Sequence, residues 1–250
     1  MSPIIVAEPL DAGRLVAREI VDAMKQLGDR AFLLGCPTGR TPGPVYECLA
    51  DEMAADSVDP TRLVFVLMDE YLTHDLELVN PQLSFSCVGY ANRCMVGPIK
   101  RVTGREPAIW CPQPNDPAEY DRRIAAAGGI DLFLLASGAS DGHIGFNPPG
   151  SSVTSITRII ELSQATRQDN LATWPALETI DQVPTHGVSV GISTIVDQSR
   201  RAIMMLLGTD KRQAFNRIVS ASNYEPDWPA TAVASVETHT IIADRQAAGA

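Results

Sequence analysis

The sequence predicts an α/β protein, a three-layer α/β/α sandwich around a mostly parallel sheet, from three observations. Short apolar runs of strand length alternate with amphipathic segments of helical period, which favours parallel strands joined by helices. Residues 63–68 are apolar throughout, as expected of a strand that helices cover on both faces. No repeat, low-complexity tract or linker interrupts the 250 residues, so we expect a single domain over residues 1–250.

The elements follow from these patterns in order along the chain. In residues 11–27, for example, apolar side chains recur at the spacing of one helix face. Strands are expected at residues 4–7, 31–34, 63–68, 130–136, 187–191, 202–207 and 240–243. Helices are expected at residues 11–27, 45–54, 84–96, 117–127, 193–196 and 211–220. Residues 69–81 are polar and irregular, whereas the weak pattern of residues 163–184 suggests a lid within residues 151–184.

Composition and charge exclude several classes of function. With 45% apolar and 20% charged residues, the chain is typical of a globular protein. Thirty acidic against twenty basic residues give a net charge of −10, which would repel nucleic acid and anionic membrane surfaces. No apolar run approaches the ~20 residues of a membrane span, and the N-terminus lacks the pattern of a signal peptide. Five cysteines without a CxxC pair disfavour disulfides and structural zinc, so we expect a cytoplasmic protein. The expected partner is a small molecule.

The first candidate loop, residues 35–42, follows the strand at residues 31–34. Ligands of parallel sheets bind beyond the carboxyl ends of the strands, where such loops converge. Hydroxyls, a flexible glycine and a cation lie here beside a helix N-terminus, whose free N–H groups attract anions. These residues are Thr38, Gly39, Arg40 and Thr41. Their spacing fits neither the dinucleotide fingerprint nor the P-loop, so a sugar monophosphate is the favoured ligand, and an ordinary strand-to-helix turn is the alternative.

The second loop places two carboxylates, Asp69 and Glu70, directly after the buried strand at residues 63–68. Partial burial raises the pKa of a carboxylate toward the range that suits a general base. The pair therefore indicates acid–base chemistry at a cleft. The alternative interpretation is a helix cap or a salt bridge within the loop.

The third loop, residues 137–150, is rich in glycine and follows the strand at residues 130–136. It contains Asp141 and His143, and a carboxylate beside an imidazole orients the ring and stabilises its charged form. This pattern favours proton transfer near neutral pH. The alternative is a surface turn in which the two side chains only brace the loop. No cysteine and histidine spacing suggests a metal site, so we expect none.

Together the three loops resemble the glucosamine-6-phosphate deaminase/isomerase family, which shares a superfamily with 6-phosphogluconolactonase. The resemblance rests on PTGRTP at residues 37–42, MDEY at residues 68–71 and DGHIGFN at residues 141–147. VGISTIVD at residues 190–197 and GTDK at residues 208–211 also match and follow in the family's order. The resemblance implies a modified Rossmann-like sheet, a sugar-phosphate substrate and no metal or organic cofactor.

The resemblance also implies roles for individual residues. The substrate phosphate would lie on residues 38–41, with Lys211 as a countercharge. Asp69 corresponds to the base that moves a proton between C2 and C1 of the open-chain sugar. His143 corresponds to the group that opens the pyranose ring, with Asp141 orienting it. Glu70 and Gly142 are expected to contact the substrate.

Three departures from the family pattern bear on this interpretation. In the deaminases, the residue after Asn147 is a glutamate that partners the ring-opening histidine, whereas this chain has Pro148. The basic phosphate ligand of the family's lid falls near Ala172, and Arg167 is a nearby substitute. A lysine associated with effector binding aligns with Ile160, which argues against allostery of the family's kind.

Three functions remain open from the sequence. The leading hypothesis is an aldose–ketose isomerase/deaminase that converts glucosamine 6-phosphate to fructose 6-phosphate and ammonia. The second is a lactonase of the 6-phosphogluconolactone type, which needs the phosphate loop and His143 but no base for a carbon acid. The third is a sugar-phosphate sensor without catalysis. The sequence leaves the sugar epimer and the oligomeric state open, a homo-oligomer included.

Overall fold

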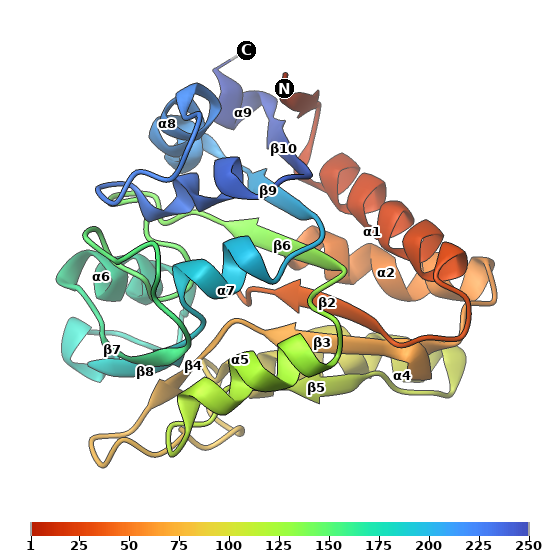
Figure 1. The fold of residues 1–250 in the computed structure, drawn as a ribbon, viewed down its shortest axis with the longest axis horizontal. Helices are drawn as coiled ribbons and strands as arrows, with labels where there is room; N and C mark the ends of the chain where they lie inside the picture. Colours follow the sequence, from red (N-terminus) through yellow and green to blue (C-terminus); the bar gives the residue numbers. More distant parts are fainter. Residues whose placement is uncertain (1, 250) are drawn as a thin grey trace.

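Seven parallel strands form the central sheet of the computed structural model, which describes residues 2–249 (Figure 1). The strands are β1 (Ile4–Val6), β2 (Phe32–Cys36), β3 (Leu63–Leu67), β5 (Ala108–Trp110), β6 (Leu132–Ala136), β9 (Ala202–Leu206) and β10 (His239–Asp244). Their order across the sheet is β1-β10-β9-β6-β2-β3-β5, and every neighbouring pair is parallel. The sheet thus has the parallel order expected when helices connect successive strands.

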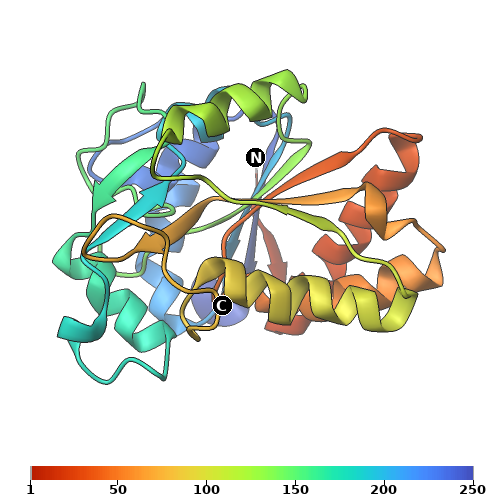
Figure 2. The ribbon, with the colours of Figure 1, turned by 90° about the horizontal axis from the view of Figure 1, so that it is seen from below.

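Helices cover both faces of this sheet. They are α1 (Pro9–Gln26), α2 (Gly43–Ala55), α4 (Gly97–Thr103), α5 (Pro117–Ala126), α7 (Ile192–Asp197), α8 (Arg212–Ser220) and α9 (Arg245–Ala248). One apolar cluster joins α1 and α2 to Leu34 and Phe65, and a second joins α5, α7 and α8 to Leu33 and Val64. Because side chains of a strand alternate between the two faces, the inner strands β2, β3, β6, β9 and β10 each contribute to both clusters. Figure 2 shows α4 and α5 on opposite sides of the sheet, which confirms the three-layer α/β/α class.

A second, three-stranded sheet lies beside the carboxyl edge of the first. It consists of β4 (Asp69–Leu72), β8 (His186–Ser189) and β7 (Arg158–Glu161), in the antiparallel order β4-β8-β7. The expectation of an irregular segment at residues 69–81 is therefore wrong for its first four residues, and neither β7 nor β5 was expected. Strands of three or four residues are too short to show a period, and their pairing depends on partners that are distant in sequence.

The expected helix at residues 84–96 is interrupted and extends further. It consists of α3 (Cys87–Tyr90), a π-helical segment (Ala91–Val96) and α4, which continues past Gly97 because Pro98 is tolerated in a first helical turn. The weakly patterned residues 163–184 contain α6 (Gln164–Thr173) and a short 3₁₀ turn (Ile180–Gln182). The other expected elements are confirmed, with their ends shifted by one or two residues. Within residues 2–249, no helix has the length and apolar character to cross a membrane.

The order of the central strands determines where the candidate loops meet. β9, β6, β2 and β3 are neighbours in the sheet, and the loops that follow their carboxyl ends leave from the same edge. These loops carry residues 208–211, 137–147, 37–42 and 68–70, respectively. The three loops singled out in the sequence, together with Lys211, are therefore brought to one place.

Candidate active site

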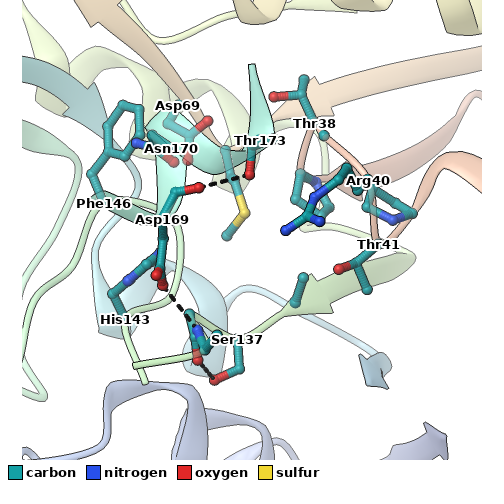
Figure 3. A pocket seen from close by; sticks show the side chains of 18 of the residues that line it. Thr38, Arg40, Thr41, Asp69, Ser137, His143, Phe146, Asp169, Asn170 and Thr173 are labelled. Carbon is teal, nitrogen blue, oxygen red and sulfur yellow. Dashed lines mark hydrogen bonds between the residues drawn. The ribbon is translucent and has the colours of Figure 1, made fainter. Parts of the chain in front are cut away.

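One cavity of about 530 Å³ lies at this edge of the sheet, between the strand ends and α6 (Figure 3). Seven of the predicted site residues line it: Thr38, Gly39, Arg40, Thr41, Asp69, His143 and Lys211. The volume lies in the range of small-molecule sites, which run from ~300 to ~1,000 Å³. The cavity has two chemically different ends, one basic and one with acid–base groups.

Asp69, the first residue of β4, lies in the cavity wall and is only 7% exposed. Burial raises the pKa of its carboxyl to about 7, and the negative charge of Glu70 raises this pKa further. The Cys87 thiol acts in the other direction, because it donates a hydrogen bond to Oδ1 at 3.4 Å. At neutral pH the carboxylate is therefore poised between its two protonation states, as a general base requires. Gly145 lets the neighbouring turn approach, because a Cβ there would lie 2.8 Å from Ser189 Oγ and 3.3 Å from Asp69 Oδ2.

His143 forms a pair with Asp141 in the turn after β6. Its Nδ1 lies 2.7 Å from Asp141 Oδ1, which also accepts the backbone N–H of His143 at 3.1 Å. Burial alone would raise the pKa of Asp141, but hydrogen bonds and charge from His143, with a further bond from Ser163, hold it below the usual value. The ring packs closely on Gly138, where a Cβ would come within 2.2 Å of Nδ1. The pair orients the imidazole in the cavity wall, while Asp141 itself stays outside the lining.

Two cationic side chains, Lys211 and Arg40, also line the cavity. The Lys211 ammonium is buried and donates to the carbonyl oxygen of Ser137 at 2.8 Å. Burial lowers the pKa of Lys211 from its ordinary value, although the nearby carboxylates of Asp210 and Asp169 act in the other direction. Arg40 is exposed at the cavity mouth, with its guanidinium 3.8 Å from Asp210 (Figure 3). Together with the turn at residues 38–41, these cations form a site suited to an anion.

Two residues expected to contact the substrate lie outside the cavity lining. Glu70 is fully buried, and its carboxylate accepts four hydrogen bonds. The donors are the backbone N–H groups of Tyr71, Cys87 and Val88 and the hydroxyl of Ser86. Gly142 has a φ of +70° and packs against the ring of Trp228. Both positions fit structural functions better than substrate contact.

The structure also brings residues to the cavity that sequence reasoning missed. The additional side chains that matter most here come from α6 and α3, and they are Asp169, Asn170, Thr173 and Cys87. Asp169 accepts the backbone N–H of Ala139 at 3.0 Å. A carboxylate oxygen of Asp169, a carboxylate oxygen of Asp141 and a ring nitrogen of His143 all lie within 4.8 Å of one another. The side-chain nitrogen of Asn170 is buried without a partner among the described residues. The weak pattern of residues 163–184 pointed to this segment but not to the side chains that face the cavity.

Comparison with known proteins agrees with this geometry. Residues 10–242 match the family model described as glucosamine-6-phosphate isomerases/6-phosphogluconolactonase. The chain belongs to this family. It is 34% identical to the glucosamine-6-phosphate deaminase of Bifidobacterium longum subsp. infantis, over 98% of this chain and 90% of that protein. The identity to the deaminase of Streptomyces avermitilis is also 34%, over 99% and 92% of the two chains. A solved structure of a monomeric glucosamine-6-phosphate deaminase superposes with a TM-score of 0.86 at 27% identity, covering 100% of this chain and 99% of that one.

The structure also shows what surrounds the positions that depart from the family pattern. Pro148 lies outside the cavity lining, where its carbonyl accepts from Ser151. Ala172 lines the cavity but has no polar group to bind a phosphate. Arg167 does not replace it, because its guanidinium donates to the carbonyl oxygens at positions 180 and 183 and lies outside the lining. Ile160 is buried in the apolar core. In this member of the family, Arg40 and Lys211 are the basic groups that line the cavity.

Proposed function

We propose that this protein is a glucosamine-6-phosphate deaminase, which converts the substrate to fructose 6-phosphate and ammonia. The observation that carries the proposal is a buried carboxylate, Asp69, whose pKa of about 7 suits a base and which shares one cavity with His143 and a basic anion site. Membership of the family and the names of the relatives support the same assignment. A lactonase would have no need for a base of this kind.

The positions of the side chains suggest a sequence of proton transfers. The phosphate binds residues 38–41, Arg40 and Lys211, which places the sugar ring toward Asp69 and His143. His143 takes the proton of the C1 hydroxyl and gives a proton to the ring oxygen as the C1–O5 bond breaks, which leaves the open-chain aldehyde. Asp69 then takes the proton from C2 while the imidazolium of His143 protonates O1, which gives the enolamine. Asp69 returns its proton to C1, and the enolamine becomes a ketimine. Water adds at C2 to give a carbinolamine. Its C–N bond breaks as the proton of the new hydroxyl passes to the nitrogen, so that C2 becomes a ketone and ammonia leaves.

We further propose that residues 151–184 form the lid of this site and that residues 1–250 act as one cytoplasmic domain. The position of α6 over the cavity supports the first statement, because Asp169, Asn170 and Thr173 contribute to the lining. A lid that contacts the substrate would exclude water while the enolamine exists.

Release of ammonia from glucosamine 6-phosphate tests the main proposal. We expect steady turnover by the wild type and a loss of at least ~100-fold in kcat for Asp69→Asn, since general base catalysis contributes about 10²–10⁴-fold. Substrate affinity should change little, because the amide has nearly the same size as the carboxylate. Asp75→Asn is the matched control, since Asp75 is exposed in the loop that follows β4. Full activity of Asp69→Asn, or no ammonia from the wild type, would refute the proposal.

The position of Pro148 favours a second candidate. Without a glutamate at this position, His143 loses a partner that the deaminases have, while a lactonase needs only the anion site and the imidazole. Hydrolysis of 6-phosphogluconolactone that survives Asp69→Asn would therefore identify a lactonase. Thermal stabilisation by both sugar phosphates without turnover of either would identify a sensor.

A further inference from the structure

Cys87 joins the anion-binding loop to the candidate base. Its thiol donates to Asp69 Oδ1 at 3.4 Å and accepts the hydroxyl of Thr38 at 3.3 Å. All three residues line the cavity, and Cys87 is only 2% exposed. We propose that Cys87 is a positioning residue for the reaction, whose thiol holds the Asp69 carboxylate in place and stabilises its ionised form. This inference rests on the proposed function.

The adjacent acids at positions 69 and 70 hold this cysteine from two directions. Asp69 accepts the thiol, while Glu70 accepts the backbone N–H of Cys87 at 2.9 Å and that of Val88 at 2.8 Å. Ser86, the N-cap residue of α3, donates its hydroxyl to Glu70 and accepts the N–H of Gly89. Glu70 therefore fixes the start of α3, so that the Cys87 side chain meets Asp69 without freedom to turn away. This accounts for a carboxylate that is conspicuous in the sequence but does not reach the cavity.

The surroundings of the thiol favour a donor rather than a nucleophile. Burial raises the pKa of Cys87 well above the usual value, and the charges of Glu70 and Asp69 raise it further. The sulfur therefore keeps its proton at neutral pH, whereas reactive cysteines need a thiolate in an electropositive environment. A neutral S–H that donates to a carboxylate favours the ionised acid, and the Thr38 hydroxyl, by donating to the same sulfur, orients the thiol proton toward Asp69.

The ionisation of Asp69 can be distinguished from that of the titratable groups around it. Glu70 lies on the same strand and supplies the one further charge that acts on the Asp69 carboxyl. The remaining groups that interact with it electrostatically are thiols and phenols whose pKa values burial raises: Cys36, Tyr46, Tyr71, Cys111 and Tyr120. These groups remain neutral through the range in which Asp69 titrates. His143 is the other proposed acid–base group in the cavity wall, so the acidic limb of the rate profile needs a second, direct measurement.

The first experiment compares the pH dependence of kcat in three variants of Cys87. In Cys87→Ala and Cys87→Val the donor is lost, so the acidic limb that reports the base should move to higher pH by roughly 0.5–1 unit. In Cys87→Ser a stronger donor replaces the thiol, so the limb should stay at the wild-type pH or move lower. Valine fills the space that alanine leaves empty, which keeps the test valid if Cys87→Ala folds poorly. Cys111→Ala is the control, because this cysteine lies outside the cavity lining and donates to the carbonyl of Pro112.

The second experiment measures the ionisation of Asp69 without turnover. The wild type and the three variants, labelled with ¹³C at aspartate carboxyls, are titrated by NMR, and Asp69→Asn assigns the signal. We expect the Asp69 titration to move to higher pH in Cys87→Ala and Cys87→Val but not in Cys87→Ser. An unchanged titration in the two apolar variants, or equal displacement in all three, would overturn the inference. Absence of ammonia release from the wild type would refute only the proposed function, since the titration still decides the relation of Cys87 to Asp69.

Discussion

Asp69, the proposed base, shows how a buried carboxyl group can reduce the stability of the fold. Its carboxyl has a pKa of about 7 in the folded protein, against an ordinary value of 3.8, because burial disfavours the charged form. Between these two values the folded state binds more protons than the unfolded state. The free energy of unfolding therefore falls as the pH rises through this window, and the loss is complete above pH 7. Below about pH 4 both states are protonated and the effect disappears.

A stability measurement on Asp69→Asn tests this account. The amide cannot ionise, so the variant should be more stable than the wild type at pH 8, by about 2–4 kcal/mol. The difference should shrink toward zero at pH 4. Urea unfolding at pH 4, 6 and 8 provides the comparison, with Asp75→Asn as the exposed control. A variant that is less stable than the wild type at pH 8 would contradict the assigned burial of the charge.

At the scale of an element, the turn after β6 depends on close approach between backbone and rings. Gly138 lies against the imidazole of His143, and Gly142 lies against the indole of Trp228 with a left-handed φ of +70°. A Cβ at position 142 would come within 2.3–2.5 Å of ring atoms of Trp228. The turn between Asp141 and His143 therefore needs glycine for both its backbone conformation and its packing.

Gly142→Ala should separate packing from backbone strain when it is compared with Gly150→Ala. Gly150 also has a positive φ, of +88°, but a Cβ there meets no atom within 4 Å. Both variants should lose about 1 kcal/mol from strain, whereas Gly142→Ala should lose a further 1–3 kcal/mol from overpacking and at least ~10-fold in kcat. Urea unfolding and ammonia release measure the two quantities. Equal losses in both variants would show that the Trp228 contact has no consequence.

The helix α6 is attached to the turn after β6 mainly through Asp169. Its carboxylate accepts the N–H of Ala139 at 3.0 Å and the hydroxyl of Ser140 at 3.3 Å. These bonds connect the proposed lid to the loop that carries His143. Loss of the acceptor would leave the N–H of Ala139 unpaired and the helix less firmly placed over the cavity.

Asp169→Ala and Asp169→Asn should therefore behave differently. We expect Asp169→Ala to raise KM by about 3–10-fold and to accelerate amide hydrogen exchange across Gln164–Thr173, because a lost hydrogen bond to a charged group is worth about 1.5–3 kcal/mol. Asp169→Asn retains an acceptor oxygen and should keep KM closer to that of the wild type. Asp181→Ala, an exposed change in the same segment, is the control. Identical exchange in all four proteins would show that Asp169 does not hold α6.

At the scale of the whole molecule, an acidic chain encloses a basic anion site. The net charge is −10, yet Arg40 and Lys211 are brought to the cavity wall from the loops that follow β2 and β9. These groups are brought together only in the folded sheet. A sugar phosphate should therefore bind the native state and not the unfolded chain.

Ligand binding should accordingly stabilise the whole fold. At a concentration 100-fold above its Kd, glucosamine 6-phosphate should add ~2.7 kcal/mol to the free energy of unfolding. This corresponds to a Tm increase of roughly 5–10 °C for a chain of this size. The increase should disappear in the double variant Arg40→Gln/Lys211→Met and persist in Lys100→Gln, because the Lys100 side chain is exposed on the surface of α4. Thermal scans with and without ligand measure the increase in Tm. Full stabilisation of the double variant by the ligand would show that the phosphate binds at another place.

The fold class, most of the strands and helices and three site loops could be predicted because their signals are local. Residues 63–68 are apolar without interruption, and residues 11–27 repeat with helical period. Asp69 directly follows an apolar strand, and Asp141 and His143 lie in the glycine-rich loop after another. The short strands β4, β5 and β7 could not be predicted, since pairing with distant residues creates them. The same holds for Asp169 and Cys87, whose positions in the cavity depend on how α6 and α3 pack.

The residues at positions 69 and 70 show which features the sequence alone determines and which depend on the tertiary structure. The chain alone determines that two adjacent carboxylates follow a buried strand at the ligand-binding edge of a parallel sheet. Only the pairing of β4 with β8 makes this segment a strand, in which neighbouring side chains point to opposite faces. Asp69 therefore faces the cavity while Glu70 holds the start of α3. Local sequence patterns determine which groups are available, but the direction in which each side chain points depends on hydrogen bonds and packing between segments far apart in the chain.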